Sequence, residues 1–296
     1  MLMLVGTLFW AANIIAGKLT LESMSALALA QVRVIGAGAA FAGLFALRRN
    51  RSRLNLTWRD WQYLALAALF GITLNQLFFI GGIGKTSAAH SGLIVALGPV
   101  MVLILSCALG LEALTPLKFF GATVSFSGVI VLTSAKAHPG SSPTWAGDVI
   151  LLVGSAVFAY YTILLKKVAR RFDALTLNTI FFILGGAFML PFGIPAMAGV
   201  SWSSLPPQAW WGIAFLVVCG SLLAYTIYAF ALTELTAARV AAFAYLQPLI
   251  AAGLGVWLLG ESLTGRVLGG GVLILLGVYL TERQSLESRA AAPTRV

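Results

Sequence analysis

Residues 85–132 read KTSAAHSGLIVALGPVMVLILSCALGLEALTPLKFFGATVSFSGVIVL, and the pattern of this stretch returns 149 positions later. The matching positions are Ala88 with Ala237, Pro99 with Pro248, Glu112 with Glu261, Thr115 with Thr264, Gly121 with Gly270 and Gly128 with Gly277. The same offset, without a gap, also pairs upstream positions, among them Lys18 with Lys167 and Gly71 with Gly220. A fixed offset over nearly the whole length indicates two copies of one structural unit.

The composition is typical of a protein surrounded by lipid. Of the 296 residues, 60% are hydrophobic and 9% are charged, against roughly 45–50% and 25% in soluble domains. The 31 glycines fit this class, because small residues let membrane helices approach closely. Cys107 and Cys219 lie in apolar runs and do not correspond under the offset, which argues against a disulfide or a metal site. We therefore expect a lipid bilayer as surroundings, with no cofactor and no metal.

Apolar stretches long enough to cross the hydrocarbon layer, about 20 residues each, occur ten times. They fall near 2–20, 27–47, 60–83, 87–110, 116–135, 145–167, 174–198, 208–232, 237–259 and 265–281. These stretches do not alternate between polar and apolar residues, and lipid requires each segment to satisfy its own backbone hydrogen bonds. The sequence therefore predicts ten transmembrane helices, five in each copy.

The basic residues predict the orientation of these helices. They gather between the second and third helices (Arg48 to Arg59), between the sixth and seventh (Lys166 to Arg171), and in the tail after Glu282. By the positive-inside rule, these segments and both termini are cytoplasmic, in the inner membrane. The formal charge of +10 is then a topology signal and does not indicate a nucleic-acid partner.

Because five is odd, the second copy must cross the membrane upside down relative to the first. We expect an all-α polytopic membrane protein with ten transmembrane helices in two inverted five-helix repeats. The predicted divisions are 1–136 for the first repeat, 137–144 for a linker, 145–282 for the inverted repeat and 283–296 for a cytoplasmic tail. Inverted repeats place a transport site near the membrane midplane, where the repeats meet.

Several motifs resemble one transporter family. The run Trp10-Ala-Ala-Asn13 followed by Lys18 is similar to the first helix of the drug/metabolite transporter superfamily, EamA type, and Arg33 in the second helix also fits. So does the repeated block of Ala-Ala, Pro, Glu and two glycines at 88–128 and 237–277. The resemblance implies a ten-helix secondary transporter, most often an exporter of amino acids, related metabolites or drugs, and here an exporter of aromatic or neutral amino acids.

The charged residues near the membrane have structural and functional interpretations. All nine acidic residues fall at predicted helix ends, in loops or in the tail, so no mid-membrane carboxylate is expected to couple transport to protons. His90 could contact substrate or relay protons; the alternative is a neutral imidazole bonded to a backbone carbonyl. Arg33 is expected to pair with Glu22 or with helix-end carbonyls, although it could hold a substrate carboxylate.

Two pairs of corresponding residues are assigned structural roles. Glu112 and Glu261 are expected to turn toward the free N–H groups of the helix that follows each of them, locking a hairpin. Pro99 and Pro248 interrupt the middle of the fourth and ninth helices. Broken membrane helices are tolerated inside the protein or along a cavity, so the symmetric breaks favour a central cavity.

Polar and aromatic residues at middle depth form the predicted substrate site. Aromatic rings with amides and few charges suit an uncharged or zwitterionic substrate with an apolar body. Together with His90, the predicted substrate-binding residues are Trp10, Asn13, Asn75, Gln76, Phe79, Tyr160, Tyr161, Tyr225, Tyr228, Tyr245 and Gln247.

Enzyme signatures are absent from the sequence, so no catalytic residue is expected. A nucleotide-sugar or phosphorylated-metabolite carrier would need cations at middle depth, and a drug-cation exporter would need a buried carboxylate. Neither is evident in the sequence, and a membrane scaffold without transport remains the alternative from a different class. The oligomeric state is left open between a monomer and a homodimer.

Overall fold

The computed structural model describes residues 2–48, 56–111, 113–134, 144–168, 172–234 and 246–290. The first half contains α1 (Leu2–Leu21), α2 (Ala26–Leu47), α3 (Trp58–Ala68), α4 (Asn75–Ile83), α5 (Ala88–Val95), α6 (Gly98–Ala108) and α7 (Pro116–Thr133). The second half contains α8 (Trp145–Val168), α9 (Ala174–Ala198), α10 (Pro207–Val217), α11 (Ala224–Glu234), α13 (Leu246–Leu259) and α14 (Gly265–Ala290). A short 3₁₀ turn, η2 (Trp202–Ser204), precedes α10.

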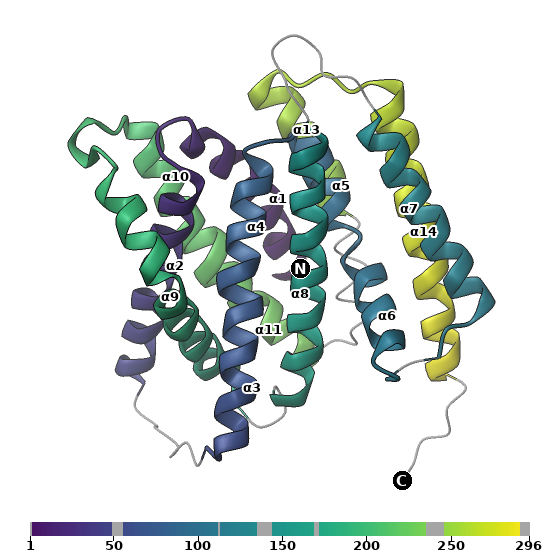
Figure 1. The fold of residues 1–296 in the computed structure, drawn as a ribbon, viewed down its shortest axis with the longest axis horizontal. Helices are drawn as coiled ribbons and strands as arrows, with labels where there is room; N and C mark the ends of the chain where they lie inside the picture. Colours follow the sequence, from purple (N-terminus) through teal and green to yellow (C-terminus); the bar gives the residue numbers. More distant parts are fainter. Residues whose placement is uncertain are drawn as a thin grey trace.

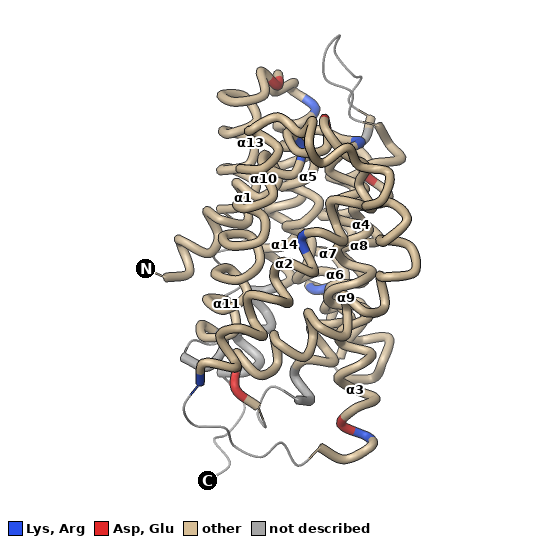
Figure 2. The backbone as a smooth tube through the Cα atoms, turned by 90° about the vertical axis from the view of Figure 1, so that its left-hand side faces the viewer, with Lys and Arg blue, Asp and Glu red and all other residues tan. Residues whose placement is uncertain are grey.

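These helices confirm the prediction of an all-α membrane protein with ten spans. Seven helical stretches are long and apolar enough to cross a membrane, and three shorter apolar helices complete the set: Pro116–Leu132, Leu246–Leu259 and Gly265–Thr281. One boundary differs from expectation, because α14 continues to Ala290, well beyond the end of its apolar stretch. The Lys, Arg, Asp and Glu residues coloured in Figure 2 lie mainly toward the top and bottom of the view.

Two of the spans contain π-helical segments at equivalent positions. The third span joins α3 to α4 through η1 (Leu69–Leu74), and the eighth joins α10 to α11 through η3 (Val218–Leu223). Both ends of these segments are separated by the same 149 positions as the sequence repeat. A π turn alters the regular backbone bonding of a helix and is frequent at functional sites, so each half carries this irregularity at the same depth.

The fourth span is broken as the prolines predict. α5 ends at Val95, four residues before Pro99, and α6 begins at Gly98, because the proline has no N–H and crowds the carbonyl four residues back. Pro248 is the third residue of α13. The residues just before α13 lie outside the described part of the chain, so the second break stays a prediction.

The two halves cross most closely where α7 packs against α14, side by side at one edge of the molecule (Figure 1). A Cβ on Gly128 would lie 2.7 Å from the carbonyl oxygen of Gly270, and a Cβ on Gly121 would lie 2.8 Å from that of Gly277. Between these contacts, Ser125 Oγ donates to the carbonyl of Ile274, 3.2 Å away and 149 positions along. Equivalent residues therefore meet across a local twofold relation, with α7 and α14 antiparallel.

The remaining helices pack across the halves in matching pairs. α2 packs on α9, α4 packs on α8, and α1 contacts α10, α11 and α13. At one end, Arg48 after α2 and Asp173 before α9 form an ion pair with Nη1 and Oδ2 2.7 Å apart. This contact places the two predicted cytoplasmic connections at the same end of the molecule, as an inverted repeat requires.

We expect Gly270→Ala to destabilise the protein, because a methyl group there would lie 2.8 Å from Gly128 O and 2.9 Å from Leu132 N. Overpacking of this kind costs about 1–3 kcal/mol. The neighbouring Gly269 has no atom within 4 Å of its Cβ position, so Gly269→Ala is the matched control and should be neutral or slightly stabilising. Thermal unfolding in detergent measures both, and equal melting temperatures would contradict the proposed crossing.

The predicted orientation can be tested with two exposed tryptophans that each begin a helix, Trp58 on α3 and Trp145 on α8. In a variant with Cys107 and Cys219 replaced by serine, Trp145→Cys should react with a membrane-impermeant thiol reagent in intact cells. Trp58→Cys should react only after the membrane is permeabilised. The reverse pattern would invert the assigned orientation, and labelling of both from one side would exclude the topology.

Candidate substrate-binding site

The centre of the candidate site is Arg33, which projects from α2 into the interior and is 2% exposed. Its Nε donates to Ser221 Oγ at 2.9 Å, and its Nη2 donates to the carbonyl of Gly220 at 3.1 Å. Both acceptors belong to the π-helical segment η3. The expected pairing with Glu22 or helix-end carbonyls is therefore wrong: the guanidinium reaches into the middle of the eighth span.

Arg33 keeps one donor for another partner. Its Nη1 is buried and has no protein hydrogen-bond partner, and the same holds for Oδ1 of Asn13 on α1. Gly220 separates the two groups: a Cβ there would collide with Asn13 Oδ1 and would lie 3.4 Å from Arg33 Nη2. The missing side chain at Gly220 thus leaves room for the side chains of Arg33 and Asn13, each of which has one unpartnered polar atom.

Aromatic rings lie beside this polar pair. Trp10 on α1 contacts Tyr225 and Tyr228 on α11, with ring centroids 6.1 and 5.2 Å apart. The Tyr225 side chain hydrogen-bonds that of Asn75 on α4 and lies close enough to Arg33 to interact with its charge. Trp10, Asn75 and Tyr228 are half-buried. Five predicted residues, Trp10, Asn13, Asn75, Tyr225 and Tyr228, therefore gather around Arg33.

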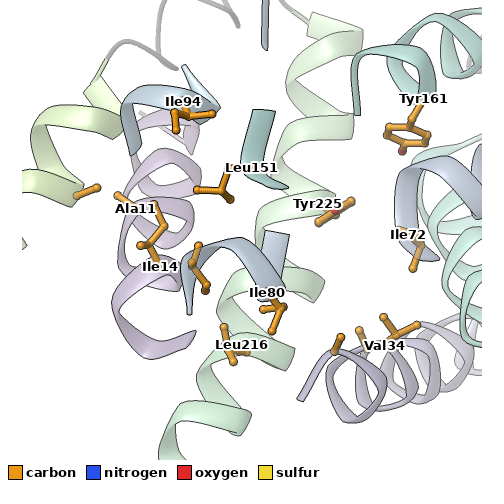
Figure 3. Packing of buried hydrophobic residues seen from close by; sticks show 14 of the residues in the cluster. Ala11, Ile14, Val34, Ile72, Ile80, Ile94, Leu151, Tyr161, Leu216 and Tyr225 are labelled. Carbon is orange, nitrogen blue, oxygen red and sulfur yellow. The ribbon is translucent and has the colours of Figure 1, made fainter. Parts of the chain in front are cut away.

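The tyrosines of α8 lie on the other side of the interior. Tyr161 is buried, with its ring 5.7 Å from that of Phe181, and it fills the space left by the missing side chain of Gly71. Tyr161 and Tyr225 point from separate helices into the same interior region (Figure 3). Tyr160 instead packs against Phe70 at 4.7 Å. Gly71 and Gly220 are equivalent in the repeat, and each is contacted by a side chain from the opposite half. Tyr161 lies against Gly71, and Asn13 lies against Gly220.

The other predicted residues are placed less centrally or are not described. Gln76 is 1% exposed with an unpartnered Oε1, and Phe79 is a partly buried ring against the core. Gln247 is buried on α13, beside the point where Pro248 approaches Gly92 of α5. Tyr245 lies outside the described residues.

His90 belongs to a second polar cluster, at the end of the molecule where α5 and α8 begin. Its Nδ1 lies 2.9 Å from Oδ2 of Asp148, and Thr86 Oγ1 donates to the other carboxylate oxygen at 2.5 Å. His90 and Asp148 are 1% and 2% exposed. The alternative of an imidazole bonded to a backbone carbonyl is therefore wrong. Sequence reasoning missed Asp148, because an acid in the first turn of a helix is ordinarily a solvated residue.

Glu261 extends this cluster, with a partner other than the one expected. Its carboxylate accepts from the backbone N–H of Ala88 at 2.7 Å and from that of Ala89 at 3.4 Å. Lys18 Nζ lies 3.7 Å from Glu261 and donates to the carbonyl of Thr86. Glu261 therefore caps α5 in the opposite half and not the helix that follows it. Glu112 lies outside the described residues.

The described residues contain no group of three or more His, Cys, Asp or Glu side chains that could hold a metal ion. The chemistry of the central cluster is that of a binding site: a fixed cation, an amide acceptor and aromatic surfaces. None of these groups is arranged as a nucleophile with its base.

Comparison with known proteins gives the same assignment for both halves. The model of the EamA-like transporter family matches residues 1–134 and 145–283. An uncharacterized transporter of Archaeoglobus fulgidus is 29% identical over 95% of this chain and 96% of its own length. A probable terminal-alkyne amino-acid exporter of Streptantibioticus cattleyicolor is 26% identical over 96% and 93%. An uncharacterized inner membrane transporter of Escherichia coli is 25% identical over 95% and 93%.

A crystal structure with 18% sequence identity matches 98% of both chains with a TM-score of 0.65, which is a likeness of fold. The family match covers most of the chain and includes both copies of the repeat. The relatives that carry a functional description are named as transporters. The chain therefore belongs to the EamA-like transporter family and is a membrane transporter.

Proposed function

We propose that this transporter exports neutral and aromatic amino acids by alternating access, and that it binds them beside Gly220. The observation that carries the proposal is the pair of unpartnered groups there, a donor on Arg33 and an acceptor on Asn13. The amino-acid exporter of S. cattleyicolor, 26% identical over 96% of this chain, supports this substrate class.

Arg33 fits the carboxylate of an amino acid. Two hydrogen bonds to η3 hold its guanidinium in place, and a buried cation without a counter-ion costs about 2.5–3.5 kcal/mol in a membrane helix. A substrate carboxylate supplies that counter-ion and accepts from Nη1 in a charge-assisted hydrogen bond. Because an anionic group relieves the cost of burying this cation, the site should prefer substrates that carry a negative charge.

The remaining parts of an amino acid have partners in the same cluster. The ammonium group can donate to Oδ1 of Asn13 and can lie over an aromatic face, where cations are attracted by the ring electrons. The half-buried rings of Trp10 and Tyr228 offer apolar surface to the side chain. A zwitterion with an apolar body therefore satisfies all three kinds of group at once.

A phosphorylated metabolite is the alternative substrate for this site, since buried Arg33 supplies the cation that the sequence did not show at middle depth. A phosphate monoester carries a charge of about −1.5 to −2, and Arg33 is the cation that the described residues bring to this cluster. One guanidinium leaves part of that charge without compensation in a buried site. The single charge of a carboxylate is the better match.

The inverted halves supply the movement. If the halves rock against each other about the α7–α14 crossing, the site near Gly220 opens to one side of the membrane at a time. We further propose that both termini are cytoplasmic in the inner membrane, and that the chain acts as a monomer or a homodimer.

Counterflow of labelled phenylalanine and leucine into liposomes tests the substrate class. The wild-type protein should discriminate strongly against phenylalanine amide, which keeps the ring and the amine but has no carboxylate. We expect Arg33→Gln to raise KM for phenylalanine roughly tenfold or more, the usual effect of losing a charged hydrogen bond. The same variant should leave KM for the amide nearly unchanged.

Loss of discrimination is the decisive readout, because a variant that merely folds poorly loses the acid and the amide in parallel. Sugar phosphates serve as competitors, and stronger competition by them than by amino acids would favour the phosphate carrier. No counterflow with any of these compounds in the wild-type protein would remove amino acids and sugar phosphates as its substrates.

A second prediction concerns Gly220. Gly220→Ala should impair transport severely, because the added methyl group would displace Asn13 Oδ1 and crowd Arg33. Gly253 on α13 is exposed and has no atom within 4 Å of its Cβ position, so Gly253→Ala provides the matched control. Equal transport rates for the two variants, at equal amounts of folded protein, would remove the site from the neighbourhood of Gly220.

A further inference from the structure

We propose that His90 and Asp148 form a proton-binding site that couples this transporter to a proton gradient. The inference rests on the proposed transport function and adds a driving ion to it. Its basis is a buried acid–base pair that joins the two halves of the protein at one end.

The hydrogen-bond geometry identifies the atom that takes the proton. An ionised carboxylate only accepts hydrogen bonds, so the 2.9 Å contact with Asp148 makes Nδ1 of His90 the donor. The neutral ring then carries its free lone pair on Nε2, which is buried and has no protein partner. Proton uptake forms an N–H bond at Nε2 and converts the ring to an imidazolium, while Nδ1 keeps its bond to Asp148.

The charges around His90 and Asp148 favour the binding of one proton by this pair. With a neutral imidazole, the buried Asp148 carboxylate is stabilised by hydrogen bonds from Thr86 and His90 alone. With the proton bound, the pair becomes an ion pair with no net charge, which is the favoured state for a buried carboxylate. Lys18 and Glu261 lie nearby but balance each other, 3.7 Å apart.

The other elements packed on α5 and α8 add few titratable groups. α4 and α13 carry none within Asn75–Ile83 and Leu246–Leu259. Lys85, just before α5, is exposed. Arg266 at the start of α14 donates to the carbonyl of Ser134 at 2.7 Å. The remaining titratable residues of these packed elements are Arg59, Asp60 and Tyr63 on α3, Cys107 on α6, Tyr160, Tyr161, Lys166 and Lys167 on α8, and Tyr279, Glu282, Arg283, Glu287 and Arg289 on α14.

Proton binding is linked to the arrangement of the halves, because the contacts of both carboxylates in the cluster cross between them. His90, Thr86, Lys18 and the N-terminus of α5 belong to the first half, whereas Asp148 and Glu261 belong to the second. A movement that separates α5 from α8 breaks the pair and changes its affinity for the proton. By reciprocity, the proton shifts the equilibrium between the open and closed forms of this end.

Proton binding can be measured first without any transport substrate. Acid titration of the purified protein should show about one bound proton fewer in His90→Gln than in the wild type. Gln keeps an N–H for Asp148 but cannot bind the proton. Asp148→Asn, which removes the carboxylate that accepts from Nδ1, should also alter the uptake of this proton. A titration that neither variant alters would overturn the proposal.

Coupling is measured as a ratio, the accumulation of labelled phenylalanine in liposomes with an imposed pH gradient divided by that without one. The wild type should give a ratio well above one, and His90→Gln a ratio of about one. Glu22→Gln removes an exposed acid between α1 and α2 and should keep the wild-type ratio. A wild-type ratio of one would contradict the proposal. So would a His90→Gln variant in which accumulation with the gradient and accumulation without it fall by the same factor.

The two experiments separate the proposals. If the wild-type protein transports none of the amino acids, the proposed substrate class fails, but the substrate-free titration still tests the proton site. If transport proceeds and the titration is insensitive to His90 and Asp148, the proton site fails alone.

Discussion

The structure depends on one constraint: in lipid, each backbone N–H and C=O must find its partner inside the protein. At two irregular places in the described interior, a side chain from elsewhere in the chain meets the exposed backbone groups. The π-helical segment η3 turns the carbonyl of Gly220 toward Arg33. The N-terminus of α5 directs the N–H groups of Ala88 and Ala89 at Glu261. The buried charges therefore lie at the irregular places in the helices, because each charge bonds the backbone groups that are left free there.

These charges share a second property, since their partners come from the opposite half of the chain. Arg33 reaches from α2 to η3, Glu261 from the segment before α14 to α5, and Asp148 from α8 to His90. A polar contact within one half would move with that half and would not change during transport. In the proposed rocking movement, contacts between the halves would break and form again, which would let these buried charges respond to substrate and proton.

The sequence was sufficient to predict the helices, because the length of each apolar stretch, its hydropathy and the 149-residue offset can all be read directly from the order of the residues. It also identified most of the central cluster, because Trp10, Asn13, Tyr225 and Tyr228 share helical faces at similar depth. Partner choice could not be predicted in the same way. Glu261 had an adjacent helix to cap, and its actual partner, α5, is 173 residues away. Asp148 had the position of a solvated acid, and only the packing of α5 on α8 shows that it is buried.

The hydrogen bond from Ser125 to Ile274 joins a residue to its own counterpart in the repeat. A contact between equivalent residues is what an antiparallel pair of identical subunits makes on its symmetry axis. The α7–α14 crossing therefore has the form of an interface between two half-length subunits packed antiparallel. Ser125 carries a hydroxyl group and its counterpart Ile274 does not, so the two sides of this crossing are chemically different although their backbones correspond.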